Sequence, residues 1–252
     1  MHYQMERTNG CRVSDSWTYR GLKTVVLENE LVRVTVLADK GADIYSFVYK
    51  ASDTDFLWRS PWGVRDPSKF MSTTGSAEAG WLDVYEGGWQ TVVPHGGYPS
   101  NVTGADLGLH AELNTMPWDA QIVEDTPARV AAKFWARGVR TPFFAEKTLS
   151  LEAGSATLTI EESVTNEGEE PAPCVWLEHI AIGDPFLSEE CRLDLPASMI
   201  MNHGELIEAN SQLKPGFEGP WPYSEGVNGD QVDFRKFPSK DVRAVDMAYM
   251  SG

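Results

Sequence analysis

The sequence predicts an all-β protein of the β-sandwich class. Several segments alternate apolar and polar residues with the period of two that is typical of a β-strand with one buried face. Gly, Pro, Asn and Asp separate these segments, and no amphipathic helix of three turns stands out. Repeated short strands divided by turn residues are the pattern of an antiparallel sandwich.

The individual strands can be placed in chain order. LVRVTVL sets Val32, Val34 and Val36 on one face, and GADIYSFVYK alternates in the same way. Two later candidates are joined by a turn at residues 153–155, which predicts a hairpin. The predicted strands lie within residues 31–37, 41–50, 129–137, 144–152, 156–166, 173–183 and 191–197.

The C-terminal segment has a different composition. Residues 203–252 are rich in Gly and Pro and have few apolar runs, so we expect a long loop that carries Trp221 and Tyr223. The start of a further strand follows at 242–250. We expect one β-sandwich domain over residues 1–252. The alternative is that this domain is incomplete at its C-terminus, because a last strand needs a partner.

Composition limits the partners of the protein. The 252 residues carry 21 basic and 37 acidic side chains, a net charge of −16, which disfavours nucleic acid and anionic membrane surfaces. There is no run of eighteen apolar residues and no apolar stretch of a signal peptide. The three widely spaced cysteines fit reduced thiols better than a disulfide framework. We therefore expect a cytoplasmic protein.

Three of the five histidines are candidate site residues. His95 lies at the centre of the glycine-rich stretch GGWQTVVPHGG, residues 87–97. His110 and Glu112 are two residues apart and would share a face of a strand, either in one pocket or as a surface pair. His179 shares a predicted strand face with apolar residues and is a core histidine unless a cleft opens there. His2 and His203 are set aside as tail and turn residues.

The residues favour a site without a cofactor or metal. The sequence has no Walker A motif, no dinucleotide-binding fingerprint and no nucleophile elbow. A His-x-Glu pair with a distant histidine is one arrangement of metal ligands, so a metal site of His110, Glu112 and His179 stays open as an alternative.

The aromatic residues point to a small-molecule carbohydrate. There are nine tryptophans, and several of them, including Trp89 and Trp221, lie in loop-like contexts beside polar residues. Aromatic rings stack on the C–H faces of neutral sugars, while amides and carboxylates bind their hydroxyls. The competing interpretation is that these tryptophans fill the edges of the core.

The order of several segments resembles the galactose mutarotase-like superfamily, in particular its aldose 1-epimerase-like members of uncertain substrate. The resemblance runs from about residue 7 to 200. It rests on LENELVRVTVLADKGADIYSF, DFLWRSPWG, GGWQTVVPHGG, GLHAELNTMPW, NEGEEPAPCVWLEHIAIGDPF and LDLPA, in that order. It implies a large twisted antiparallel β-sandwich, called a supersandwich, with a sugar cleft on one concave face.

The resemblance also implies roles for single residues. His179 would be the acid that protonates the ring oxygen of an aldose, and His110 would orient that oxygen or share the role. His95 stands where the superfamily often has Asn. It joins the expected substrate contacts, which are Trp89, Gln90, His95, Glu112 and Trp221.

The base of the mutarotase mechanism has no match in the sequence. In the superfamily it is a Glu on a late strand, and this chain offers no convincing counterpart. Three functions therefore remain open. The first is an epimerase that interconverts the anomers of a free aldose. The second is a non-catalytic sugar-binding β-sandwich. The third is a metal-dependent sugar isomerase or lyase.

Overall fold

A computed structural model of the protein describes residues 7–252, and His2 lies outside this range. Contacts along the chain divide it into two compact units. One ends at Phe186 and the other is Leu187–Gly252. The expectation of a single domain stays a prediction.

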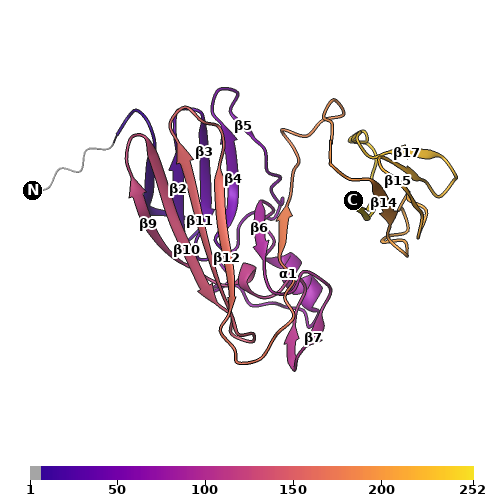
Figure 1. The fold of residues 1–252 in the computed structure, drawn as a ribbon, viewed down its shortest axis with the longest axis horizontal. Coiled ribbons are helices and arrows are strands. Elements are labelled where there is room, and N and C mark those ends of the chain that lie inside the picture. The colour runs from indigo at the N-terminus through magenta and orange to yellow at the C-terminus, as the bar shows by residue number, and fades with distance from the viewer. Residues whose placement is uncertain (1–6) are drawn as a thin grey trace, which may run out of the picture. The chain divides into compact units, whose positions relative to one another are not determined.

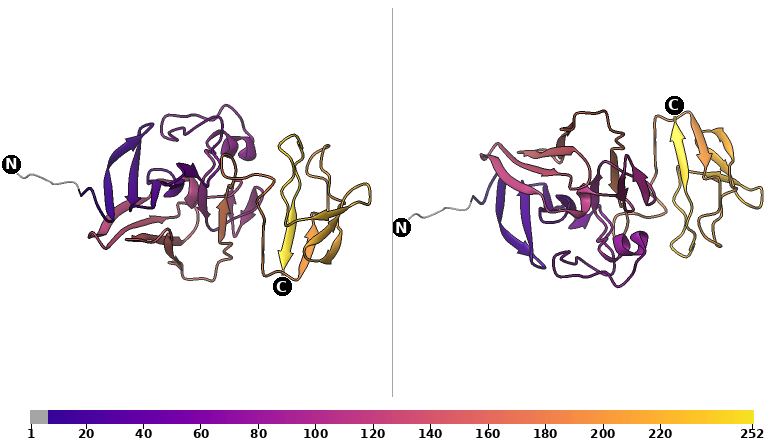
Figure 2. Two further views of the ribbon diagram at one scale, coloured as in Figure 1. Left: turned by 90° about the horizontal axis from the view of Figure 1, so that it is seen from above. Right: turned by 90° about the horizontal axis from the view of Figure 1, so that it is seen from below.

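The first unit is built around two antiparallel sheets (Figures 1 and 2). The first sheet has the order β1-β2-β3-β4-β6-β13, with β5 paired to β4, and the second has the order β12-β11-β10-β9. The strands of the first sheet are β1 (Arg12–Tyr19), β2 (Leu22–Glu28), β3 (Val32–Leu37), β4 (Asp43–Tyr49), β5 (Thr54–Asp55), β6 (Trp89–Val92) and β13 (Leu177–Ile180). Those of the second are β9 (Asp119–Asp125), β10 (Arg129–Arg137), β11 (Phe143–Glu152) and β12 (Thr159–Asn166).

The hydrophobic core lies between the two sheets. Alternate residues of β3 are buried, as the period of two predicts, and they pack with residues of β10 and β11 from the other sheet. Phe134 and Leu149 are fully buried in this cluster. The predicted hairpin is confirmed, since β11 and β12 pair from Phe143 with Asn166 to Ser150 with Thr159. The all-β sandwich class is therefore confirmed.

A long connection joins β5 of the first sheet to β9 of the second. It holds the helix α1 (Ala77–Asp83), the strand β6, the small hairpin of β7 (Ser100–Val102) and β8 (Ala105–Leu107), and the 3-10 helix η1 (Leu113–Thr115). The side-chain oxygen of Ser76 accepts a hydrogen bond from the backbone of Ala79 and caps the start of α1. This connection carries most of the candidate site.

The second unit corrects two predictions. Residues 203–252 are not one long loop, because short strands pair there: β14 (Met199–Asn202) with β15 (Glu218–Pro220) and β18 (Ala248–Ser251), and β16 (Tyr223–Glu225) with β17 (Gln231–Asp233). Strands of three or four residues are too short to show a period of two. Residues 191–197 form no strand, and only Arg192 makes an isolated bridge.

Two glycines before β6 allow the chain to pass close to its neighbours. Gly87 and Gly88 both have positive φ, and a Cβ atom on Gly87 would lie 2.3 Å from the carbonyl oxygen of Trp58. Only glycine fits such a position, because it combines a left-handed backbone with a contact that no side chain can make.

We expect Gly87→Ala to lower the free energy of unfolding by more than about 1 kcal/mol, because it adds a steric clash to a left-handed conformation. Gly63→Ala is the matched control, since Gly63 also has positive φ but no atom within 4 Å of its added Cβ. Urea unfolding of both variants separates the cost of the clash with Trp58 from the cost of the left-handed conformation. Equal losses would contradict the role of the Trp58 contact.

Candidate functional site

Two of the predicted catalytic residues lie side by side. His179 is in β13, and His110 is in the loop between β8 and η1. Their ring centroids are 5.2 Å apart, although the residues are 69 positions apart in the sequence (179 minus 110). Both rings are half-buried. We call these two residues the histidine pair.

Two aromatic side chains that were not singled out as site residues enclose the histidine pair. Trp81 in α1 lies 4.9 Å from the ring of His110 and 5.8 Å from the ring of His179. Tyr85 stacks on Trp81 at 4.5 Å and meets His179 edge-on at 5.5 Å. Trp81 and Tyr85 are four residues apart, the spacing that places side chains on one side of a helical turn. The sequence had also marked Trp81 as one of the tryptophans in loop-like contexts, although it lies in α1, whereas Tyr85 had no other signal.

Local hydrogen bonds orient the ring of His110. Its Nδ1 lies 3.0 Å from the carbonyl oxygen of Gly96, and its backbone N–H donates to the carbonyl of Gly97 at 3.2 Å. The backbone N–H of His95 donates in turn to the carbonyl of Ala111 at 3.0 Å. The end of the GGWQTVVPHGG stretch therefore acts as the backbone support of His110.

Pairing between β6 and β13 orients His179. His179 lies opposite Gln90, and Glu178 lies opposite Thr91. The Nδ1 atom of His179 is buried and has no hydrogen-bond partner among the described residues. Only Nε2 is left to meet a ligand.

The environment keeps both imidazoles neutral over a wider pH range than in water. Burial lowers the pKa of His110, and the nearby His179 lowers it further. Burial also lowers the pKa of His179, with Asp43 opposing and Lys40 reinforcing the shift. Burial raises the pKa of Tyr85 to about 12, so its phenol is neutral at pH 7.

A buried ionic cluster lies on the same side of the first sheet. The Nζ atom of Lys40 is 2.7 Å from a carboxylate oxygen of Asp43 and 2.8 Å from one of Glu86, and all three side chains are at most 1% exposed. The amide of Gln90 donates to Asp43 at 3.0 Å. Gln90 thus links this cluster to the strand pair that holds His179. Burial raises the pKa of Glu86, while the two carboxylates raise that of Lys40.

Trp89 and Glu178 face the other way. The indole N–H of Trp89 donates to Glu178, and the hydroxyl of Thr91 donates to Glu162 of β12 in the second sheet. Consecutive strand residues alternate between faces, so these side chains point between the sheets while Gln90 and His179 point to the outer face. Burial and the neighbouring Glu162 raise the pKa of Glu178 to about 7.

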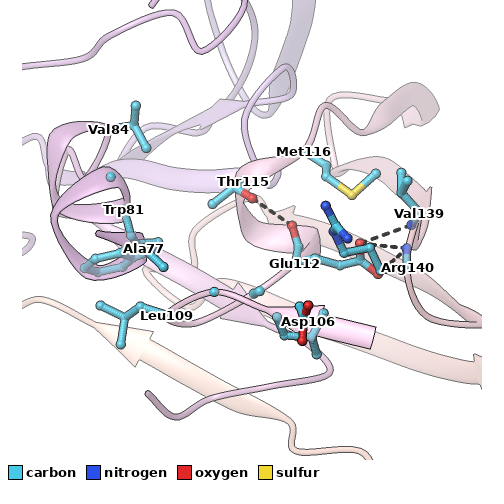
Figure 3. A pocket seen from close by; sticks show the side chains of 14 residues that line it. Ala77, Trp81, Val84, Asp106, Leu109, Glu112, Thr115, Met116, Val139 and Arg140 are labelled. Atoms are coloured by element: carbon cyan, nitrogen blue, oxygen red, sulfur yellow. Dashed lines mark hydrogen bonds between the residues drawn. The ribbon is translucent and has the colours of Figure 1, made fainter. Parts of the chain in front are cut away.

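Glu112 is occupied by backbone donors. Its carboxylate accepts hydrogen bonds from the backbone N–H groups of residues 139–141 and from the hydroxyl of Thr141. Figure 3 shows Glu112 beside Arg140, at the edge of a pocket of about 410 Å³. The pocket adjoins the histidine pair through Trp81, which lines it, while neither histidine does.

The remaining predicted contacts lie outside the histidine pair. The ring of His95 bonds to the carbonyl of Tyr98 at 2.7 Å and lies beside Ser100, so it supports the 95–100 turn. Trp221 belongs to the second unit, where its backbone N–H donates to the carbonyl of Ser198.

Comparisons with known proteins place this geometry in context. Residues 19–238 match the family described as "Domain of unknown function (DUF4432)". The chain belongs to the DUF4432 family. No curated protein sequence matches the chain.

Solved structures show the fold of this DUF4432 chain. A galactose mutarotase-like protein from Clostridium acetobutylicum matches with a TM-score of 0.53 and 14% identity, over 77% of this chain and 62% of that one. A TPR-domain containing protein from Parabacteroides distasonis matches with a TM-score of 0.53 and 17% identity, over 79% of this chain and 28% of that one. The chain thus spans less than two thirds of each of these proteins. The galactose mutarotase-like β-sandwich is therefore confirmed as the fold.

Two further properties of the DUF4432 chain concern metals and membranes. Within residues 7–252, no group of three or more His, Cys, Asp or Glu side chains is arranged to hold a metal ion. Glu112 was one of the three residues considered as metal ligands. Its carboxylate is hydrogen-bonded to backbone donors and does not lie with the two histidines. No helix in the same range is long and apolar enough to cross a membrane.

Replacing Lys40 tests the buried cluster. We expect Lys40→Met to lower the free energy of unfolding of the DUF4432 chain by about 3–5 kcal/mol, because it leaves the buried Asp43 and Glu86 without their cation. Lys69→Met is the control, since the side chain of Lys69 is 71% exposed and its loss should change little. Urea unfolding measures both. An equal effect of the two variants would contradict the buried pairing.

Proposed function

We propose that this protein is a carbohydrate epimerase of the mutarotase type, which interconverts the anomers of a free aldose. The histidine pair is the observation that carries the proposal. Mutarotation needs an acid at the ring oxygen and a base at the anomeric hydroxyl of the same sugar. Two half-buried imidazoles whose ring centroids are 5.2 Å apart provide two proton-transfer groups close enough to act on one sugar ring.

The proposed acid is His179. Its Nε2 delivers a proton to the ring oxygen as the bond from that oxygen to the anomeric carbon breaks. The open aldehyde then rotates, and ring closure on the other face reverses the proton transfers. Trp81 and Tyr85 provide the aromatic surface for the C–H face of the sugar, the role that the sequence had favoured for Trp89.

A non-catalytic sugar-binding site is the second candidate. The two carboxylates nearest to the histidine pair in the sequence do not face it, since Glu178 points between the sheets and Glu112 is bound by backbone N–H groups. A site without a carboxylate base would still bind a sugar against Trp81 and Tyr85. Catalysis and binding must therefore be measured separately.

Polarimetry on α-glucose, α-galactose and further aldoses separates the two candidates. We expect the protein to accelerate mutarotation and His179→Ala to reduce kcat by about 10²- to 10⁴-fold, the usual contribution of a general acid. His203→Ala is the control, because His203 bonds to Tyr249 within the second unit. If saturation-transfer NMR shows sugar binding but mutarotation is not accelerated, the result supports the binding protein and contradicts the epimerase.

The pH dependence of kcat/KM tests the acid role of His179. The groups around this residue are the rings of Trp81, Tyr85 and His110, together with the charges of Asp43 and Lys40. An acid acts only while protonated, and the pKa of His179 is lowered. The rate should therefore fall as pH rises through a value below about 6.5, the pKa of a free imidazole. A rate that stays constant from pH 5 to 8 would remove His179 as the acid.

A further inference from the structure

The proposed epimerase needs a base, and the hydrogen bond between His110 and Gly96 identifies a candidate. A carbonyl oxygen only accepts hydrogen bonds, so the Nδ1 of His110, 3.0 Å from the carbonyl of Gly96, must carry the proton in that bond. A neutral imidazole has one N–H. The Nε2 of His110 is then an unprotonated acceptor, and no hydrogen bond from the described residues occupies it.

We propose that the Nε2 atom of His110 is the general base that removes the proton of the anomeric hydroxyl, with His179 as its acid partner. This inference rests on the proposed function and assigns the missing step to a residue already in the site. The backbone carbonyl of Gly96 acts as the positioning group, because it holds the proton on Nδ1 and turns the lone pair of Nε2 toward the ligand.

The two histidines alone account for every proton that moves in the reaction. The reactive form carries one extra proton, on His179, while His110 is neutral. His110 takes the proton of the anomeric hydroxyl, whose oxygen forms a double bond to the anomeric carbon. The bond from that carbon to the ring oxygen breaks, and its electron pair accepts the proton of His179. The extra proton now lies on His110, and ring closure returns each proton to its origin.

Electrostatics limit the pair to one extra proton. Two cationic rings 5.2 Å apart repel each other, so the second proton is resisted. Asp43 favours the cation of His179 and Lys40 opposes it, while the Gly96 carbonyl favours the cation of His110 and the ring of His179 opposes it. When His179 carries the single extra proton, His110 is neutral and free to accept.

The backbone conformation of His110 makes asparagine a suitable replacement for testing its role. His110 has φ of +47°, a left-handed conformation that Asn adopts more readily than most residues. In His110→Asn, the side-chain NH₂ group replaces the Nδ1 proton at Gly96, but nothing replaces Nε2. We expect kcat for the mutarotation of the best aldose to fall by about 10²- to 10⁴-fold, with KM changed less than about threefold. Added imidazole should restore the rate in proportion to its unprotonated form.

Two measurements decide between a base and a merely orienting residue. Nitrogen-15 NMR of the wild-type protein should show His110 protonated at Nδ1 and bare at Nε2. His203→Asn, in the second unit, should leave kcat unchanged. Wild-type kcat in His110→Asn, a rise in KM alone, or an Nε2 proton on His110 would overturn the base role and leave the epimerase standing. A wild-type protein that accelerates no aldose would overturn both proposals.

Discussion

In the pairing of β6 with β13, Gln90 lies opposite His179 and Thr91 lies opposite Glu178, and this register organises the whole site. Because the side-chain period of a strand is two, a shift by one residue would turn His179 between the sheets and bring Glu178 to the outer face. The present register keeps Glu178 with Trp89 on the inner side and leaves the imidazole beside Trp81 and Tyr85.

The surroundings of the two histidines hold this register in place. The first sheet carries a buried cluster of Lys40, Asp43 and Glu86. Gln90 is hydrogen-bonded to Asp43 of this cluster, which links β6 to the start of β4. Removing one member of such a cluster strongly destabilises the folded protein, because the remaining charges stay buried without a partner. The glycines before β6 allow the close approach to Trp58 that brings this strand beside its neighbours.

Several strands with regular alternation were predictable, whereas β1, β2 and β9 were not singled out. β3, β10 and β12 lie within their predicted ranges, because burial of one face imposes a period of two on the sequence. β13 is only four residues long within the eleven predicted, and the strands of the second unit have three or four residues each. In such segments the backbone pairing depends on distant partners and leaves no local pattern.

Some residues of the candidate site could also be predicted from the sequence, and others could not. His110 and His179 could be chosen from the sequence as groups able to transfer protons near neutral pH, and the structure brings them together. Trp81, Tyr85 and the Lys40 cluster could not, because only the fold brings α1 and the residues before β6 beside the histidines.

The stretch GGWQTVVPHGG shows what each level determines. By itself, the sequence determined that two glycine pairs flank a segment that holds Trp89, Gln90 and His95 as candidate contacts. Only the tertiary structure decided that Trp89 faces the core, that Gln90 binds Asp43 and that the carbonyl of Gly96 supports His110. The physical reason is that alternation assigns residues to two faces, while the neighbouring elements decide which face meets the core and which meets the site.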